Sequence, residues 1–170
     1  MNTATATATD FHTISLHVRN VPGALVRISL VFSRRGFNIE SLVVSPGKTE
    51  EFSRMTITSS GDPETLEQVV KQLQKLIDVV HAADHTDQDC IDVEVALVKV
   101  KIPLDDRTAV LQVVEHYHGK VVDYAGESII IRIAGTSGKI DAFVDLMAQW
   151  DILELVRSGK LLMARGLEET

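Results

Sequence analysis

The sequence predicts an α+β protein built from two tandem ferredoxin-like βαββαβ domains. The first observation behind this class is that strand-like alternation and helix-like periodicity follow one another in the order β-α-β-β-α-β. The second is that the same order returns in the other half of the chain, without a residue-level repeat. The third is a polar, acidic stretch without periodicity between the two cycles. A chain of 170 residues is long enough for two small domains.

These patterns divide the chain into four segments. We expect a disordered tail over residues 1–11, a first domain over 12–85, a linker over 86–92 and a second ferredoxin-like domain over 93–170. The tail begins MNTATATATD, which is of low complexity and lacks the basic and apolar regions of a secretory signal. The linker, TDQDCID, is polar and acidic.

The first cycle opens with Ile14, Leu16 and Val18 alternating with polar residues, which predicts a half-buried strand. Pro22 fits the first turn of the helix that follows, because its missing N–H costs nothing there, and Gly36 fits the C′ position. The apolar stripe of this helix consists of Ala24, Leu25, Ile28, Val31 and Phe32.

A hairpin and a second helix complete the first cycle. Strands are predicted over 39–44 and 52–58, with a turn at Pro46-Gly47 between them. Asp62 is the predicted cap of the second helix. The apolar face of this helix consists of Leu66, Val69, Val70, Leu73, Leu76 and Ile77, and a fourth strand follows over 79–82.

The second cycle begins with a predicted strand over 93–102. Asp105 is the expected cap of a helix that ends at Gly119. The remaining elements are strands over 121–124, 128–133 and 152–156 and a helix that Thr136 or Ser137 caps and that carries Ile140, Phe143, Val144 and Met147.

Composition excludes several classes of function. Seventeen basic and 24 acidic residues give a net charge of −7, which disfavours binding to nucleic acid or to an anionic membrane surface. No apolar run reaches the length of a transmembrane helix. The single cysteine, Cys90, excludes an internal disulfide, so we expect a cytoplasmic protein.

The stretch Asn20-Val21-Pro22-Gly23 leads a strand directly into a helix and is the candidate binding site. Such a helix start presents free backbone N–H groups that attract a carboxylate or a phosphate, and Gly23 has no side chain to shield them. Asn20 and Asn38 carry amides that can both donate and accept hydrogen bonds. With apolar walls from Val21, Leu25 and Ile39, this set suits a free amino acid with a small branched side chain. An equally open interpretation is that Asn20 only ends a strand and Gly23 only permits a tight turn.

Other motifs do not predict a site. Gly135-Thr136-Ser137-Gly138-Lys139 lacks the spacing of a phosphate-binding loop and is interpreted as a capped helix start. The six histidines have no cysteine pair or carboxylate at ligand spacing, so surface histidines are expected and no metal site is predicted. Cys90 lies in an acidic stretch, and no paired carboxylates or nucleophile motif suggests catalysis. An RNA-binding sheet would need exposed aromatics on its central strands and a basic face, whereas the third strand has a single aromatic, Phe52, at its edge and the chain is acidic.

Several stretches in order along the chain resemble the small, regulatory subunit of bacterial acetolactate (acetohydroxyacid) synthase. They are NVPGALVRISLVFSRRGFNIESL, SRMTI, LEQVVKQLQKLIDV, LVKV, IAGTSGKIDAF and VRSGKLLMARG. The first alone would indicate only an ACT domain, an amino-acid-sensing module, whereas the set covers nearly the whole chain after the tail.

The resemblance implies a non-catalytic subunit in branched-chain amino acid biosynthesis. Its expected partners are a second copy, paired through the ACT domains, the large catalytic subunit, which it activates, and L-valine, which acts as a feedback inhibitor. Thiamine diphosphate, magnesium and FAD are expected in the catalytic subunit and no cofactor in this chain. The alternative is a free-standing ACT-domain sensor that regulates another enzyme or transcription, and a metal-binding module ranks last.

The resemblance also implies which residues contact valine. These are Asn20, the backbone of Gly23 and Ala24, and Asn38 from the neighbouring chain, with a pocket shaped by Val21, Leu25, Val26 and Ile39. Pro22, also included in the site, departs from the family pattern together with Val21, because many relatives have polar residues before the glycine. Proline also removes one backbone donor.

Overall fold

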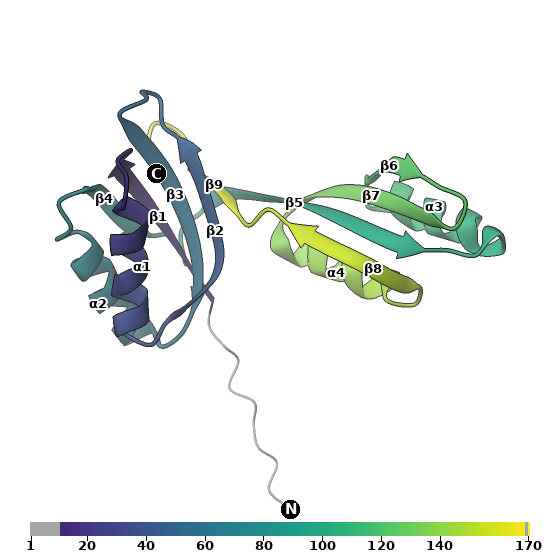
Figure 1. The fold of residues 1–170 in the computed structure, drawn as a ribbon, viewed down its shortest axis with the longest axis horizontal. Coiled ribbons are helices and arrows are strands. Elements are labelled where there is room, and N and C mark those ends of the chain that lie inside the picture. Colours follow the sequence, from purple (N-terminus) through teal and green to yellow (C-terminus); the bar gives the residue numbers. More distant parts are fainter. Residues whose placement is uncertain (1–10, 169) are drawn as a thin grey trace, which may run out of the picture. The chain divides into compact units, whose positions relative to one another are not determined.

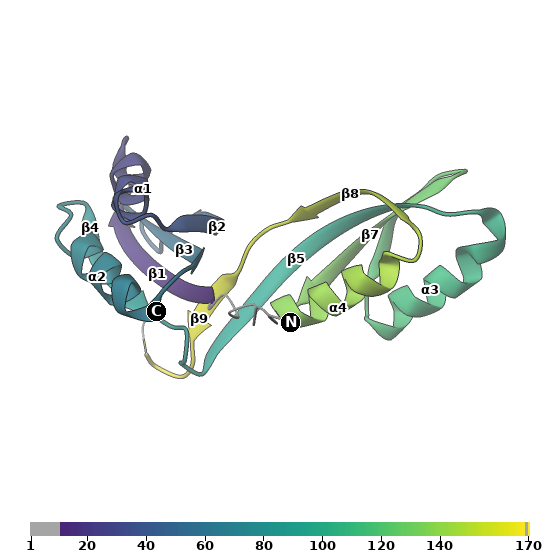
Figure 2. The ribbon, with the colours of Figure 1, turned by 90° about the horizontal axis from the view of Figure 1, so that it is seen from below.

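The computed structural model describes residues 11–168 and residue 170 and confirms the predicted α+β class. It contains two antiparallel sheets, and each sheet has two helices against one face (Figures 1 and 2). Two compact units result: one runs to Ile91 and includes Leu162–Thr170, and the other is Asp92–Leu161. The predicted tail, residues 1–11, lies outside the described residues except for Phe11, which begins the first strand.

The first unit is built around a sheet with the order β2-β3-β1-β4. Alternating buried residues of β1 and β3 contact the apolar faces of both helices, and Ile14, Ile28, Phe32 and Leu66 lie at the centre of this core. Its elements are β1 (Phe11–Arg19), α1 (Ala24–Arg34), β2 (Asn38–Pro46), β3 (Phe52–Ser60), α2 (Pro63–Leu73) and β4 (Val79–Asp84).

The sequence predicted Pro22 in the first turn of the helix, and this prediction is wrong. Pro22 lies in a turn that precedes α1. The N–H of Ala24 donates to the carbonyl of Val21 over 3.3 Å, and Gly23 has φ 83° and ψ −5°. These are the marks of a type II turn with proline and glycine at its two central positions, which is the arrangement that both residues favour. The Pro-Gly pair therefore reverses the chain between strand and helix.

The second helix begins as predicted and ends early. Asp62 caps it by accepting a hydrogen bond from the Thr65 amide over 3.0 Å. Because the helix ends at Leu73, Ile77 leaves the predicted apolar face and is 83% exposed.

The second unit has a sheet with the order β6-β7-β5-β8, and β9 pairs with β5. Its core combines alternate residues of β5 and β7 with Val110 of α3 and Ile140, Phe143 and Met147 of α4. Its elements are β5 (Cys90–Lys101), the 3₁₀ turn η1 (Leu104–Asp106), α3 (Arg107–His116), β6 (Lys120–Tyr124), β7 (Ser128–Gly135), α4 (Ser137–Met147) and β8 (Asp151–Arg157). Strand β9 (Leu161–Ala164) pairs with β5, but all of it except Leu161 is grouped with the first unit.

Three details of this unit differ from the sequence prediction. Asp105 does not cap α3, because it lies inside η1 and the helix begins two residues later. Strand β5 begins at Cys90, within the stretch interpreted as a linker. Strand β9 was not predicted. Thr136 does cap α4, as expected, by accepting a hydrogen bond from the amide of Lys139 over 3.4 Å.

The last residues of the chain group with the first unit and not with the second. The carbonyl of Thr170 accepts a hydrogen bond from Arg54 over 2.9 Å, and its hydroxyl accepts one from the Ala164 amide over 2.7 Å. Arg165 forms an ion pair with Asp89 over 3.0 Å. These contacts attach the segment that follows Leu161 to the first unit.

Candidate functional site

Asn20 is the first residue after β1 and is fixed by the loop between β2 and β3. Its amide N–H donates to the carbonyl of Glu51 over 2.8 Å, and its side-chain Nδ2 donates to the carbonyl of Glu50 over 3.1 Å. Among the described residues no donor reaches its Oδ1, and the side chain is exposed. Asn20 therefore presents a positioned acceptor to a ligand's ammonium group.

The N-terminus of α1 has no side-chain cap. Gly23 occupies the cap position and has no side chain, and the amides of Leu25 and Val26 have no hydrogen-bond acceptor among the described residues. The side chains of Asp62 and Thr136 cap α2 and α4, whereas Asp106 at the start of α3 makes no such hydrogen bond. Free amides at the positive end of the helix dipole can bind a carboxylate.

The apolar residues around this helix start divide into exposed and buried ones. Val21, Leu25 and Val26 are exposed at 41%, 38% and 62%, so they are available to an aliphatic ligand group. Ala24 is buried at 4% exposure, so only its backbone can face a ligand. Arg27 forms an ion pair with Asp78, and its Nη1 would lie 3.1 Å from a Cβ added to Gly23.

Asn38 does not lie beside Asn20 within one chain. Asn38 is paired with Ser60 at one end of β3, whereas Arg19, the residue before Asn20, is paired with Phe52 at the other end. The eight residue steps between Phe52 and Ser60 span about 26 Å. The predicted site residues therefore form two groups at opposite ends of this strand.

A shallow hollow surrounds the second group. It has a volume of about 490 Å³ and is lined by Asn38, Ile39 and residues from the C-terminal half of α1 and the turn after it. Asn38 donates from Nδ2 to Glu40 Oε1 over 3.0 Å, and its carbonyl accepts from the Ser59 hydroxyl over 2.7 Å. Asn38 is thus held in place at the start of the edge strand β2.

Glu40 is a candidate site residue that the sequence interpretation missed. Hydrogen bonds from the Ser60 hydroxyl and then from the Asn38 amide lower the pKa of its carboxyl below the ordinary 4.5. Glu40 is therefore ionised at neutral pH and places a negative charge next to Asn38. No local pattern marks Glu40, because the pairing of β2 with β3 shifts register between Ile39 and Ser41 and its partner Ser60 lies on the neighbouring strand.

Two histidines that were expected at the surface are buried in the first unit. His85 Nε2 lies 2.7 Å from the Ser15 hydroxyl and its Nδ1 lies 2.7 Å from Gln88 Oε1, so both ring nitrogens have protein partners. His12 Nε2 lies 3.1 Å from the carbonyl of Gly61. In the described part of the chain, no three His, Cys, Asp or Glu side chains lie close enough together to hold a metal ion.

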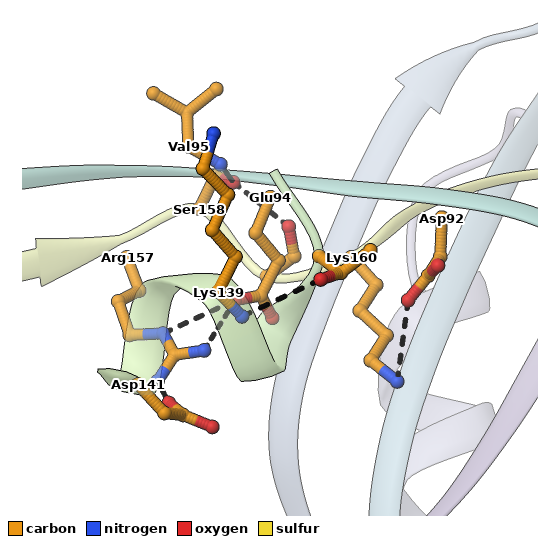
Figure 3. Close-up of polar contacts among 10 residues, drawn as sticks. Asp92, Glu94, Val95, Lys139, Asp141, Arg157, Ser158 and Lys160 are labelled. Atoms are coloured by element: carbon orange, nitrogen blue, oxygen red, sulfur yellow. Dashed lines mark hydrogen bonds and ion pairs between the residues drawn. The ribbon is translucent and has the colours of Figure 1, made fainter. Parts of the chain in front are cut away.

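The signature stretches of the second unit meet in a polar cluster (Figure 3). Arg157 of β8 forms ion pairs with Glu94 of β5 and, from Nη1 over 2.5 Å, with Asp141 of α4. Burial acts to lower the pKa of Arg157, but hydrogen bonds to Glu94 and then to Asp141 raise it above its ordinary value. Since Glu94 is only 6% exposed, the guanidinium neutralises a buried carboxylate, and the cluster is structural.

Fold and site together define a protein with an ACT domain in its first unit. Residues 14–81 match the family model for the AHAS small subunit-like ACT domain, and residues 93–166 match the family model for the small subunit of acetolactate synthase. The chain belongs to the acetolactate synthase small subunit family. Membership implies that it pairs with a catalytic subunit.

Individual relatives agree with this family. A probable acetolactate synthase small subunit of Archaeoglobus fulgidus is 41% identical over 155 residues, which cover 91% of this chain and 97% of that protein. The acetolactate synthase small subunit of Mycobacterium bovis is 38% identical and covers 91% of this chain and 92% of its own length. The crystal structure of the small subunit from Thermotoga maritima has a TM-score of 0.82 at 36% identity and covers 92% of this chain and 98% of that chain.

None of the helices in the described residues combines the length and apolar character needed to cross a membrane.

Proposed function

We propose that this chain is the regulatory subunit that activates the thiamine-diphosphate-dependent catalytic subunit of acetolactate synthase and makes it sensitive to valine. The observation that carries the proposal is the N-terminus of α1, where the Leu25 and Val26 amides have no hydrogen-bond acceptor in the part of the chain that the structure describes. In this proposal the protein acts in the cytoplasm, in branched-chain amino acid biosynthesis. Thiamine diphosphate, magnesium and FAD are held by the catalytic subunit, and this chain is not itself an enzyme.

L-valine fits the groups at this helix start. Its carboxylate would accept hydrogen bonds from the free amides, its ammonium would donate to Oδ1 of Asn20, and its isopropyl group would contact Val21, Leu25 and Val26. Pro22 lies in the turn before the helix, so its missing N–H does not remove an amide from the helix terminus.

Two chains together would complete the site. β2 is an edge strand, and a two-fold axis that pairs two β2 edges antiparallel would place the start of one β2 against the end of the other. The end of β2 leads into the loop whose Glu50 and Glu51 hold Asn20. Asn38, with the ionised Glu40, would thus reach Asn20 of the partner copy, and valine would lie between two ACT domains.

The regulatory step would then be a shift between two geometries of this dimer. Valine bound between two chains favours the geometry that it fits better, and the catalytic subunit responds to that geometry. Coupling of this kind typically amounts to about 1–3 kcal/mol, and a ligand with equal affinity for both geometries would shift nothing.

Calorimetric titration of the purified protein with L-valine tests the effector site, with L-leucine, L-isoleucine and D-valine as comparators. We expect saturable, stereoselective binding, followed by valine-sensitive activation when the catalytic subunit of the same organism is added. Absence of heat with every branched-chain amino acid would refute the sensing role, while activation without valine sensitivity would leave only the activating role.

A further inference from the structure

Glu40 has one carboxylate oxygen that is available to a ligand. The Ser60 hydroxyl donates to its Oε1 over 2.8 Å and the Asn38 amide donates to the same atom over 3.0 Å, so both contacts hold the carboxyl group in one position. No donor among the described residues reaches its Oε2, and the residue is exposed on the edge strand β2. Oε2 is therefore a positioned, charged acceptor.

Asn38 and Asn20 each offer a further acceptor. The Nδ2 of Asn38 donates to the Glu40 carboxylate, and the Nδ2 of Asn20 donates to the Glu50 carbonyl. Because a carboxylate and a carbonyl can only accept, these two bonds fix which end of each amide is the nitrogen. The Oδ1 atoms of both asparagines have no donor in the part of the chain that the structure describes. Both residues are exposed, so each offers its oxygen to a ligand.

The three free oxygens match an ammonium group, which has three N–H donors and no acceptor. In the two-chain site of the proposed function, Oδ1 of Asn20 comes from one copy, and Oδ1 of Asn38 and Oε2 of Glu40 come from the other. Hydrogen bonds from Ser60 and then from Asn38 lower the pKa of the Glu40 carboxyl, so its negative charge is present at neutral pH. A hydrogen bond between an ammonium and a carboxylate is about twice as strong as one between neutral groups.

We infer that Glu40 and the two asparagines form an ammonium subsite that restricts the effector to amino acids. The inference rests on the proposed function, which brings these residues of two copies together. The 2-oxo acid and the 2-hydroxy acid with the carbon skeleton of valine have the same carboxylate and the same isopropyl group. They fit the start of α1 equally well, but the oxo acid has no donor for the three oxygens and the hydroxy acid has one. The site therefore responds to the amino acid and not to these analogues.

The test combines a change of charge in the protein with a change of charge in the ligand. Glu40→Gln keeps the shape of the side chain and an oxygen for the bonds from Ser60 and Asn38, but it removes the negative charge. Calorimetry gives the Kd for L-valine and for the L-2-hydroxy acid of the same skeleton. We expect the unsubstituted protein to bind valine at least about tenfold more tightly than the hydroxy acid. In Glu40→Gln the Kd for valine should rise by about tenfold or more, while the Kd for the hydroxy acid stays nearly unchanged.

Glu115→Gln is the matched control, because it makes the same change at an exposed residue of α3 that forms no ion pair with any described residue. Its Kd for valine should equal that of the unsubstituted protein, and thermal unfolding of each variant checks that the fold is retained. If the hydroxy acid gives no heat with the unsubstituted protein, the Kd for valine alone decides.

An unchanged Kd for valine in Glu40→Gln would overturn the inference while the proposed function stands. An equal loss of affinity for both ligands would also overturn it, because Glu40 would then act only by positioning Asn38. Failure of the unsubstituted protein to bind valine would overturn the proposed valine site and the inference together.

Discussion

At Gly23, substitutions can separate the effect of an added negative charge from the effect of a changed backbone geometry on valine inhibition. Its φ of 83° is unfavourable for most side chains, but asparagine and aspartate tolerate this region better than others. An added Cβ would meet only the end of the flexible Arg27 side chain at 3.1 Å. We expect Gly23→Asp to abolish valine inhibition and to preserve activation, because its carboxylate competes for the amides intended for valine's carboxylate.

Gly23→Asn is the control, since it has the same shape and backbone strain without the charge. Charged hydrogen bonds are worth about 1.5–3 kcal/mol, so the half-inhibitory valine concentration should be at least about tenfold higher for Asp than for Asn. Equal effects of the two substitutions would assign the loss to backbone geometry. Full valine sensitivity of Gly23→Asp would show that the site lies elsewhere.

At the scale of residues, the sequence predicted which residues could contact a ligand but not which distant residues lie next to them in the fold. Asn20 and Gly23 stand where a strand meets a helix, and a local pattern is enough to find them. Glu40 was missed because its role depends on Ser60, a neighbour across the hairpin. The burial of His85 was missed for the same reason, since its partner Ser15 lies 70 positions away in the sequence.

At the scale of elements, Arg157 joins β8 to β5 and α4. Replacing it by methionine would leave the carboxylate of Glu94 buried without a counter-charge. Because the Arg157 side chain is 33% exposed, we expect a loss of about 2 kcal/mol, below the range for fully buried pairs. Urea unfolding followed by the fluorescence of Trp150, which belongs to the same unit, measures this loss.

Two further variants separate the contributions within this cluster. Asp141→Asn removes the ion pair between Arg157 and Asp141, whose side chain is 56% exposed. It should change the unfolding free energy by no more than about 0.5 kcal/mol. Adding Glu94→Gln to Arg157→Met should restore about half of the loss, because the buried charge is then gone. An effect of Asp141→Asn equal to that of Arg157→Met would contradict this assignment.

Elements with their own periodicity and caps were predicted well, and those defined by distant partners were not. Asp62 and Thr136 act on amides three residues away, so they can be recognised locally. Strand β9 is four apolar residues without polar alternation, and it is defined by its pairing with β5. The extension of β5 back to Cys90 likewise lies in a stretch whose composition is typical of a linker.

At the scale of the whole molecule, the proposed site belongs to a pair of chains. Asn20 and Asn38 lie about 26 Å apart along β3, too far for one amino acid to contact both within a single chain. Each homodimer carrying Asn20→Ala or Asn38→Ala should therefore lose valine binding at both of its sites. In a mixed dimer of the two variants, one site lacks both asparagines and the other keeps both.

Mixed dimers, isolated with a different affinity tag on each chain, should bind valine with nearly unchanged affinity at half the stoichiometry of the unsubstituted protein. Calorimetry measures both quantities in one titration. If each site were formed within one chain, every site of the mixed dimer would carry one substitution and binding would not recover. If the two chains do not form a mixed dimer at all, the proposed pairing through the ACT domains is wrong. The proposal of a site shared by two chains is then wrong as well.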